Sequence, residues 1–185
     1  MFRQGLPFCG HDEGDALENQ ENFLELLYFL ANHNEEVNAM VLKNASENLK
    51  LTSLDIQKNI INAIVVQTLN AIIMDVGDRC FSIFIDESRD VSTNEQMTIM
   101  LRYVNEKGNM VESFLGVDHV TSTTANSLKG KIDAMLSRHG LSIFKCHRQG
   151  YDGASNMNEE FKGLKTLNLR ENESVYYIHC FAHQL

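Results

Sequence analysis

The spacing of the apolar residues changes near Gly77, and this change limits the folds that the chain can adopt. Before Gly77, apolar residues recur every three or four positions, which is the period of an amphipathic helix. After it, residues 81–85 form a nearly continuous apolar run, and alternate positions from Met97 to Tyr103 are apolar, as in strands. The pattern therefore predicts a helical region followed by a domain that contains a sheet.

Two helices are predicted in the first region. One covers residues 18–32 and carries one apolar face, made of Phe23, Leu26, Leu27 and Leu30. The other begins at the capping-box sequence of residues 52–55 and ends near Gly77. Packing against a core accounts for the apolar positions of this long helix, and a partner-binding surface is the alternative.

The region after Gly77 is predicted to contain five strands and two helices. Residues 81–85 resemble a central strand covered on both faces, and a hairpin loop at residues 106–109 joins the second strand to a third that ends near His119. The remaining elements are, in chain order, a helix over residues 124–139, a strand over 141–146, a helix after Asp152 and a strand over 175–178.

This order of elements predicts an α/β protein of the ribonuclease-H-like class. The sheet begins with three successive strands that are linked by hairpins and pair antiparallel. Alternating helices and strands follow them in the same mixed sheet. In that fold the first and fourth strands lie side by side. We expect three parts: an irregular arm over residues 1–17, a helical region over 18–78 and the ribonuclease-H-like core over 79–185.

Two aspartates are the candidate site residues. Asp86 follows the apolar run of residues 81–85, and Asp152 lies in the glycine-bracketed segment of residues 150–156. Carboxylates held at the ends of neighbouring strands can share a divalent metal ion. The alternatives are that Asp86 caps a turn, that Asp152 belongs to an ordinary Asp-Gly turn, and that Asn156 caps the next helix.

A cysteine and a histidine near the end of the chain form a second, weaker pattern. Cys180 and His183 have Cys-x-x-His spacing, and with Cys146 and His147 they would complete a four-ligand zinc site. A buried thiol and a hydrogen-bonded histidine at a strand-to-helix junction are the favoured alternative, so zinc is not expected. The four cysteines show no disulfide framework, which fits a reducing compartment.

The charge balance disfavours strong binding of nucleic acid. Sixteen basic residues against twenty-five acidic residues give a formal net charge of −9, which repels a polyanion. We also find no apolar stretch of membrane-spanning length and no secretory signal in the sequence, so we expect a soluble, intracellular protein without a membrane partner.

Five segments of the chain resemble the hAT superfamily of cut-and-paste transposases and the proteins derived from them. The nearest similarity is to plant proteins described as zinc finger MYM-type protein 1-like, whose central region is a domain of unknown function of the DUF4371 type. The segments are residues 10–13, 19–23, 86–92, 149–157 and 179–185.

The resemblance implies a transposase core in which an Asp-Asp-Glu triad binds two divalent ions, Mg²⁺ or Mn²⁺. Asp86 would be the first aspartate of the triad and Asp152 the second. Cys180 and His183 would fall on the family's Cys-x-x-His element after the fifth strand. The implied chemistry is attack of water on a DNA phosphodiester and then attack by a DNA hydroxyl, in a nuclear protein.

The chain departs from this family in three places. The family's glutamate lies downstream of the Cys-x-x-His element, beyond Leu185, so we expect the third carboxylate to be absent. The amino-terminal zinc finger of relatives, which contacts DNA, is also expected to be absent. Residues 146–150 read Cys-His-Arg-Gln-Gly where relatives carry Arg-Gly-Gln-Gly before Tyr-Asp, which removes one glycine before Asp152. We therefore expect a fragment with weak metal binding, little DNA binding and no cleavage by itself.

Two other functions remain open. The first is a domesticated nuclear module that binds a protein partner or forms a homo-oligomer without catalysis. The second is an active nuclease in which Glu87 or Asp90 replaces the missing glutamate. This second reading is disfavoured, because Glu87 should point away from Asp86 if the strand continues through both residues.

Overall fold

The computed structural model describes Leu6 and residues 22–41, 53–89, 95–152, 154–158 and 162–179. The Cα positions group the chain into two compact units, residues 1–67 and residues 68–185. The boundary lies within the long helix α3 (Leu54–Val76). The sheet and the candidate site belong wholly to the second unit.

Three helices begin in the first unit. Helix α1 (Asn22–His33) lies within the region predicted to be helical, whereas the short helix α2 (Glu35–Met40) was not predicted. Asn34 makes this second helix possible, because its side chain accepts a hydrogen bond from the backbone N–H of Val37 at 3.1 Å. The predicted arm over residues 1–17 lies outside the described residues, apart from Leu6.

Helix α3 has apolar residues on all sides, and its last turns pack in the way predicted. Val76 is fully buried in the core of the second unit, and three residues before it pack against that core: Leu69, Ile72 and Ile73. Val65 and Met74 are exposed, by 47% and 81%. Core packing is therefore found for the predicted positions Leu69, Ile72 and Val76 in the second unit.

Helix α3 is also the one described helix whose length and composition would allow it to cross a membrane, so the expectation that no apolar stretch reaches that length is wrong. A helix that packs against protein can have the same composition. Several amide side chains favour packing against protein, because amides are costly in hydrocarbon. These are Gln57, Asn59, Asn62, Gln67 and Asn70.

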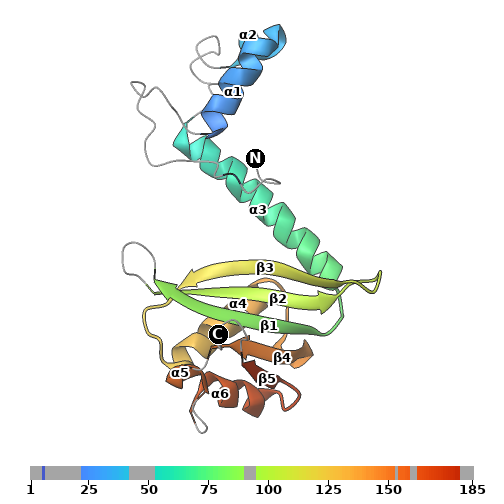
Figure 1. The fold of residues 1–185 in the computed structure, drawn as a ribbon, viewed down its shortest axis with the longest axis vertical. Helices are drawn as coiled ribbons and strands as arrows, with labels where there is room; N and C mark the ends of the chain where they lie inside the picture. The colour runs from blue at the N-terminus through green and yellow to red at the C-terminus, as the bar shows by residue number, and fades with distance from the viewer. Residues whose placement is uncertain are drawn as a thin grey trace. The chain divides into compact units, whose positions relative to one another are not determined.

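Five strands form one mixed sheet in the order β3-β2-β1-β4-β5 (Figure 1). Their bounds are Phe81–Arg89 for β1, Glu95–Val104 for β2, Met110–His119 for β3, Cys146–Tyr151 for β4 and Tyr176–His179 for β5. Strands β1, β2 and β3 pair antiparallel, whereas β4 pairs parallel to both β1 and β5. The predicted fold class and the predicted neighbourhood of the first and fourth strands are confirmed.

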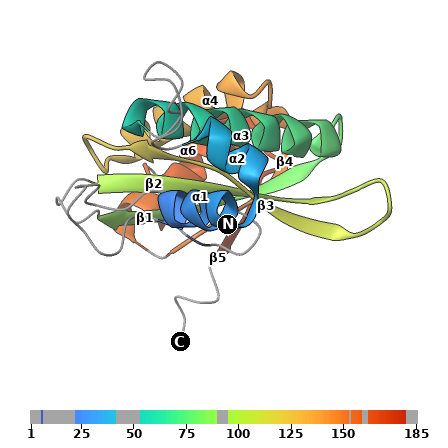
Figure 2. The ribbon, with the colours of Figure 1, turned by 90° about the horizontal axis from the view of Figure 1, so that it is seen from above.

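Helices α4 (Ala125–Arg138) and α6 (Leu164–Glu171) pack on one face of the sheet (Figures 1 and 2). Side chains at alternate positions of β1 and β2 point to this face and are almost completely buried. The strand residues of this core are Phe81, Ile83, Ile85, Met97, Ile99, Leu101 and Tyr103, and those of α4 are Leu128, Ile132, Met135 and Leu136.

The opposite face of the sheet carries apolar side chains that remain accessible to water. Phe114, Val117 and Ile178 are exposed by 53%, 47% and 41%. Phe84, which alternates with the core residues of β1, is half-buried. The expectation that residues 81–85 are covered on both faces is therefore wrong, because the covering helices described in this unit pack on one face.

The fourth strand lies further along the chain than predicted. Residues 143–145 form a 3-10 turn, which Ser142 caps by accepting a hydrogen bond from the N–H of Phe144 at 3.3 Å. Strand β4 then covers Cys146–Tyr151 instead of residues 141–146. Its mostly polar sequence forms a central strand because its backbone pairs with β1 on one side and with β5 on the other.

Candidate functional site

The pairing of β1 with β4 aligns the two aspartates. Phe84 is the register partner of Gly150, and Asp86 and Asp152 each lie two residues further along their own segments. Side chains alternate between the faces of a sheet with a period of two, so equal offsets from one paired position lead to the same level of neighbouring strands. The structure thus brings the two segments together at one edge of the sheet.

The close approach of Phe84 to β4 depends on the absence of a side chain at Gly150. A Cβ atom added there would lie 2.7 Å from two carbons of the Phe84 ring, which is closer than carbon atoms can pack. The guanidinium carbon of Arg102 lies 4.4 Å from the centroid of the same ring. The ring is therefore held between the backbone of β4 and a cation.

We expect Gly150→Ala to lower the free energy of unfolding by about 1–3 kcal/mol, because the added methyl group displaces the Phe84 ring. Urea unfolding measures this cost. In a Phe84→Ala background the same substitution should cost clearly less, since no ring remains to be displaced. Equal costs in the two backgrounds would show that the contact with Phe84 is not the reason for a glycine at this position.

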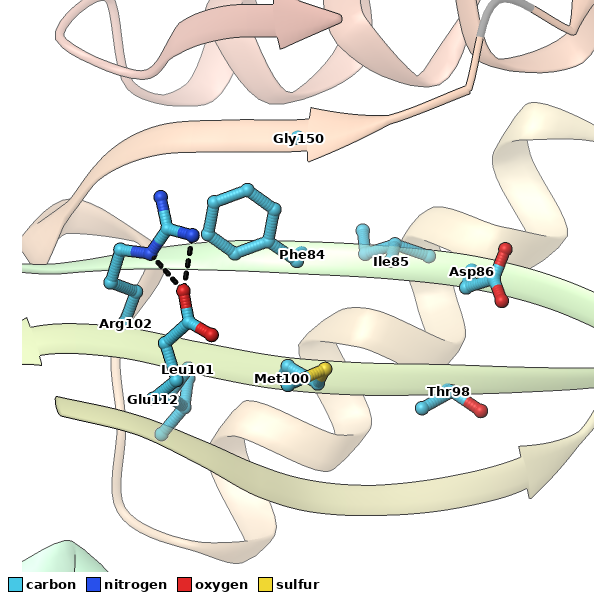
Figure 3. Close-up of a pocket in the computed structure, with 9 residues that line it drawn as sticks. All are labelled: Phe84, Ile85, Asp86, Thr98, Met100, Leu101, Arg102, Glu112 and Gly150. Carbon is cyan, nitrogen blue, oxygen red and sulfur yellow. Dashed lines mark hydrogen bonds and ion pairs between the residues drawn. The ribbon is translucent and has the colours of Figure 1, made fainter. Parts of the chain in front are cut away.

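Asp86 lies within β1 and not at its end. The strand continues to Arg89 because residues 86–89 pair with the first residues of β2, down to Glu95. The Asp86 side chain is exposed and lies at one end of an open pocket of about 250 Å³ (Figure 3). The pocket is lined by Phe84, Ile85, Asp86, Thr98, Met100, Leu101, Arg102, Glu112 and Gly150.

The pocket walls are mainly apolar and contain one ion pair. Arg102 on β2 forms a hydrogen-bonded ion pair with Glu112 on β3, at the end of the pocket away from Asp86 (Figure 3). These two opposite charges largely neutralise each other. The carboxylate of Asp86 therefore gives its own end of the pocket a negative potential.

Asp152 is the first residue after β4, and its loop is held by two hydrogen bonds. Its Oδ1 atom accepts a hydrogen bond from the N–H of Ala154 at 3.2 Å, which is the Asx-turn geometry weighed as an alternative. Its backbone carbonyl accepts a hydrogen bond from the Tyr177 hydroxyl on β5 at 3.3 Å. Asp152 is half-buried, so its carboxylate is both oriented and accessible to solvent.

Asn156 connects this loop to two other segments. It lies inside the short helix α5 (Ser155–Asn158), so the alternative that it caps the next helix is wrong. Its Nδ2 atom donates to the backbone carbonyl of Thr123 at 2.8 Å and to Oε1 of Glu87 at 3.2 Å. The end of β1, the segment before α4 and the segment after β4 therefore meet at one amide group.

The surroundings of Glu87 disfavour its ionised form. Partial burial raises the pKa of Glu87 above its ordinary value of 4.5, and the hydrogen bond from Asn156 offsets part of this rise. The negative charges of Asp152, Glu95 and Asp86 raise the pKa further. Burial is therefore the main cause of the raised pKa of Glu87, and the three neighbouring carboxylates add to it.

The raised pKa of Glu87 predicts a pH dependence of stability that Glu87→Gln should remove. A carboxyl group with a raised pKa in the folded state stabilises the fold below pH 4.5, and this contribution is lost as the pH rises through the raised pKa. Between about pH 4 and pH 7, urea unfolding should therefore show a smaller loss of stability in Glu87→Gln than in the unsubstituted chain. Parallel curves of stability against pH for the two proteins would contradict a raised pKa of Glu87.

Within the described residues, no three acidic, cysteine or histidine side chains are grouped so that they could hold a metal ion. Asp86 and Glu87 are successive residues of one strand, so their side chains point to opposite faces of the sheet. This orientation disfavours the hypothesis that Glu87 replaces the missing glutamate beside Asp86. Asp90, the other candidate replacement, lies outside the described residues. The paired aspartates remain the candidate ligands.

The second half of the zinc pattern cannot be placed, because Cys180 and His183 lie outside the described residues. The first half is unfavourable for zinc. Cys146 is completely buried, its thiol donates to the carbonyl of Arg148 at 3.1 Å, and burial raises the pKa of this thiol to about 11. Zinc binds the thiolate form, which such a site disfavours at neutral pH.

A model of the DUF4371 family, described as the ZMYM1/FAM200, RNase-like domain, matches residues 1–163. The match covers the helical region, β1 to β4 and both aspartates. The matched range includes residues of both compact units.

Two curated relatives match nearly the whole chain. The human and mouse proteins named "52 kDa repressor of the inhibitor of the protein kinase" are 25% and 24% identical to it over 185 residues, which is 97% of this chain. The chain spans only about 24% of the length of either relative.

Proposed function

Because the chain belongs to the DUF4371 family of ZMYM1/FAM200 RNase-like domains, we propose that it is a transposase-derived domain of the hAT type. In this proposal the domain keeps the first two carboxylates of the ancestral metal site and binds a divalent cation weakly through Asp86 and Asp152. It does not cleave DNA by itself.

One observation carries the proposal: the parallel register of β1 and β4 pairs Phe84 with Gly150, and Asp86 and Asp152 each lie two residues further along. An aspartate that only caps a turn needs no such partner. The exposed position of Asp86 and the fixed loop of Asp152 also support a site that is open to a ligand.

The ligand types fit Mg²⁺ or Mn²⁺, because these ions prefer carboxylate oxygens and water. Asp86 and Asp152 would hold the ion, and Glu87 would add to the negative potential around it. A bound ion of this kind polarises a phosphoryl oxygen and activates water. Two carboxylates provide less charge than the three of the family triad, so we expect weak binding of a single ion.

The absence of cleavage is tested with a DNA-nicking assay in Mn²⁺, using a supercoiled plasmid. We expect the same background nicking from this chain and from the Asp86→Asn/Asp152→Asn variant. Metal-dependent nicking that the variant loses would contradict the proposal and would favour an active nuclease with a third ligand elsewhere. The net charge of −9 also favours weak DNA binding, which salt should abolish.

A second candidate function is a nuclear interaction module without catalysis. The accessible apolar side chains on the open face of the sheet favour it, because large exposed apolar patches often mark protein interfaces. The relatives named as repressors are consistent with a regulatory role and with a nuclear location. Sedimentation equilibrium tests whether the interaction module self-associates. A dimer that persists in EDTA would support the module, whereas a monomer would exclude self-association as its function.

A further inference from the structure

The side chain of Asn156 is the meeting point of three segments that are distant in the sequence. It reaches the carbonyl of Thr123 at 2.8 Å and the carboxylate of Glu87 at 3.2 Å, both from Nδ2. Asp152 and Asn156 share one short segment, and Glu87 directly follows Asp86. A bond between Asn156 and Glu87 therefore links the two segments that carry the candidate metal ligands.

We propose that Asn156 is a positioning residue for the two-carboxylate site: it sets where the Asp152 segment lies relative to β1. The part of the inference that concerns metal binding rests on the proposed function. The part that concerns the loop does not, because it follows from hydrogen bonds within the protein.

The chemistry of the junction requires a donor at position 156. Both partners, a carbonyl oxygen and a carboxylate, can only accept hydrogen bonds. The amide of asparagine supplies two N–H groups on one nitrogen, and each partner takes one. An aspartate has nearly the same shape but only acceptors at neutral pH, so it would turn two attractions into two repulsions.

Repulsion between carboxylates predicts in which direction the Asp152 segment moves when Asn156 is replaced. The carboxylates of Glu87 and Asp152 carry like charges, which repel each other across the junction. The two hydrogen bonds that hold Asp152 lead to Ala154 and to Tyr177, and neither of these bonds reaches β1. If Asn156 no longer donates to Glu87, repulsion should therefore move the Asp152 segment away from β1.

The experiment compares Asn156→Asp with Glu87→Gln, with the double variant and with Asn109→Asp. The last is a charge-matched control at an exposed position of the β2–β3 hairpin. The double variant exchanges the amide and the carboxylate, so its net charge equals that of the unsubstituted chain, and the amide introduced by Glu87→Gln can donate to the new carboxylate. Two readouts are used: hydrogen exchange of the Met157 amide, which donates to the Ala154 carbonyl at 3.0 Å, and Mn²⁺ affinity by calorimetry.

We expect Asn156→Asp to speed exchange of the Met157 amide by about tenfold or more, which corresponds to the loss of one charge-assisted hydrogen bond. Mn²⁺ affinity should fall by a similar factor. Glu87→Gln and Asn109→Asp should leave exchange nearly unchanged, because the side-chain carbonyl introduced by Glu87→Gln still offers an acceptor to Asn156. The double variant should recover at least half of the lost protection on a logarithmic scale.

Unchanged exchange in Asn156→Asp, or no recovery in the double variant, would overturn the positioning role. If the unsubstituted chain binds no Mn²⁺ but exchange behaves as expected, the proposed metal function fails and the positioning role stands. If Asn156→Asp does not fold, Asn156→Ala replaces it. That variant removes the donors without adding charge and should still speed exchange at Met157, whereas unchanged exchange would again overturn the role.

Discussion

Gln149→Ala should destabilise the second unit by about 3–4 kcal/mol, the largest stability effect that we expect from a single polar substitution in this chain. Gln149 is fully buried in β4. Its Nε2 atom donates to the carbonyls of Lys165 and Val175 at 3.2 and 3.1 Å. Its Oε1 atom accepts from the Tyr151 hydroxyl at 3.0 Å and from Asn168 at 2.7 Å. Truncation therefore leaves four polar groups, three of them buried, without this partner and opens a cavity among them.

Tyr151→Phe provides the matched control for this prediction. It removes one donor to Gln149 and leaves the bond from Asn168, so it should cost only about 1 kcal/mol. Urea unfolding followed by circular dichroism measures both variants. Equal effects of the two substitutions would contradict the view that Gln149 joins β4, α6 and the start of β5 through one network.

Asp152→Asn should reduce Mn²⁺ affinity by at least roughly tenfold, because it removes one of two negative charges next to a divalent cation. Asp86→Asn should have an effect of similar size. Both substitutions keep the shape of the side chain, so the fold should survive. Calorimetric titration of the folded variants measures the loss.

Asp55→Asn is the charge-matched control for these variants, since Asp55 is exposed on α3 in sequence far from the site. It should bind Mn²⁺ as the unsubstituted chain does. If all three variants lose the same small amount of affinity, then Mn²⁺ responds to the net charge of −9 and not to a defined pair of ligands.

Much of the fold could be predicted from the spacing of apolar residues. The alternation from Met97 to Tyr103 placed β2, because a half-covered strand repeats with a period of two. The hairpin turn before β3 was also found, and Gly108 adopts the positive φ of 76° that favours glycine there. From these elements and the later helices the ribonuclease-H-like class was predicted, and with that class the neighbourhood of the first and fourth strands.

Strand β4 could not be placed by the same reasoning. Its sequence from Cys146 to Tyr151 is mostly polar, and its hydrogen bonds come from strands on both sides that lie far away in the sequence. Burial of Gln149 is stabilised by groups from α6 and from Val175, which no local pattern reveals. The apolar residues Leu141, Ile143 and Phe144 instead led to a strand prediction over residues 141–146, part of which forms the 3-10 turn.

The residues of the candidate site were also predicted only in part. Asp86 and Asp152 stood out because each follows a segment with a strong strand or turn signal, and the sheet order placed them together. The link between Glu87 and Asn156 was missed, because it depends on which face each residue of β1 presents and on where α5 begins. The available sequence signal was Asn156, four positions after Asp152, and it was interpreted as a possible helix cap.

Paramagnetic broadening by Mn²⁺ in a ¹⁵N-resolved NMR spectrum would locate the ion directly. At a small fraction of an equivalent of Mn²⁺, we expect the amide signals of Ile85, Asp86, Glu87, Asp152 and Ala154 to broaden first, while those of Glu106 and Glu173, exposed in loops at the opposite end of the sheet, remain sharp. Broadening that begins at Glu106 and Glu173, or that spreads evenly over the acidic surface, would contradict a two-carboxylate site at the edge shared by β1 and β4.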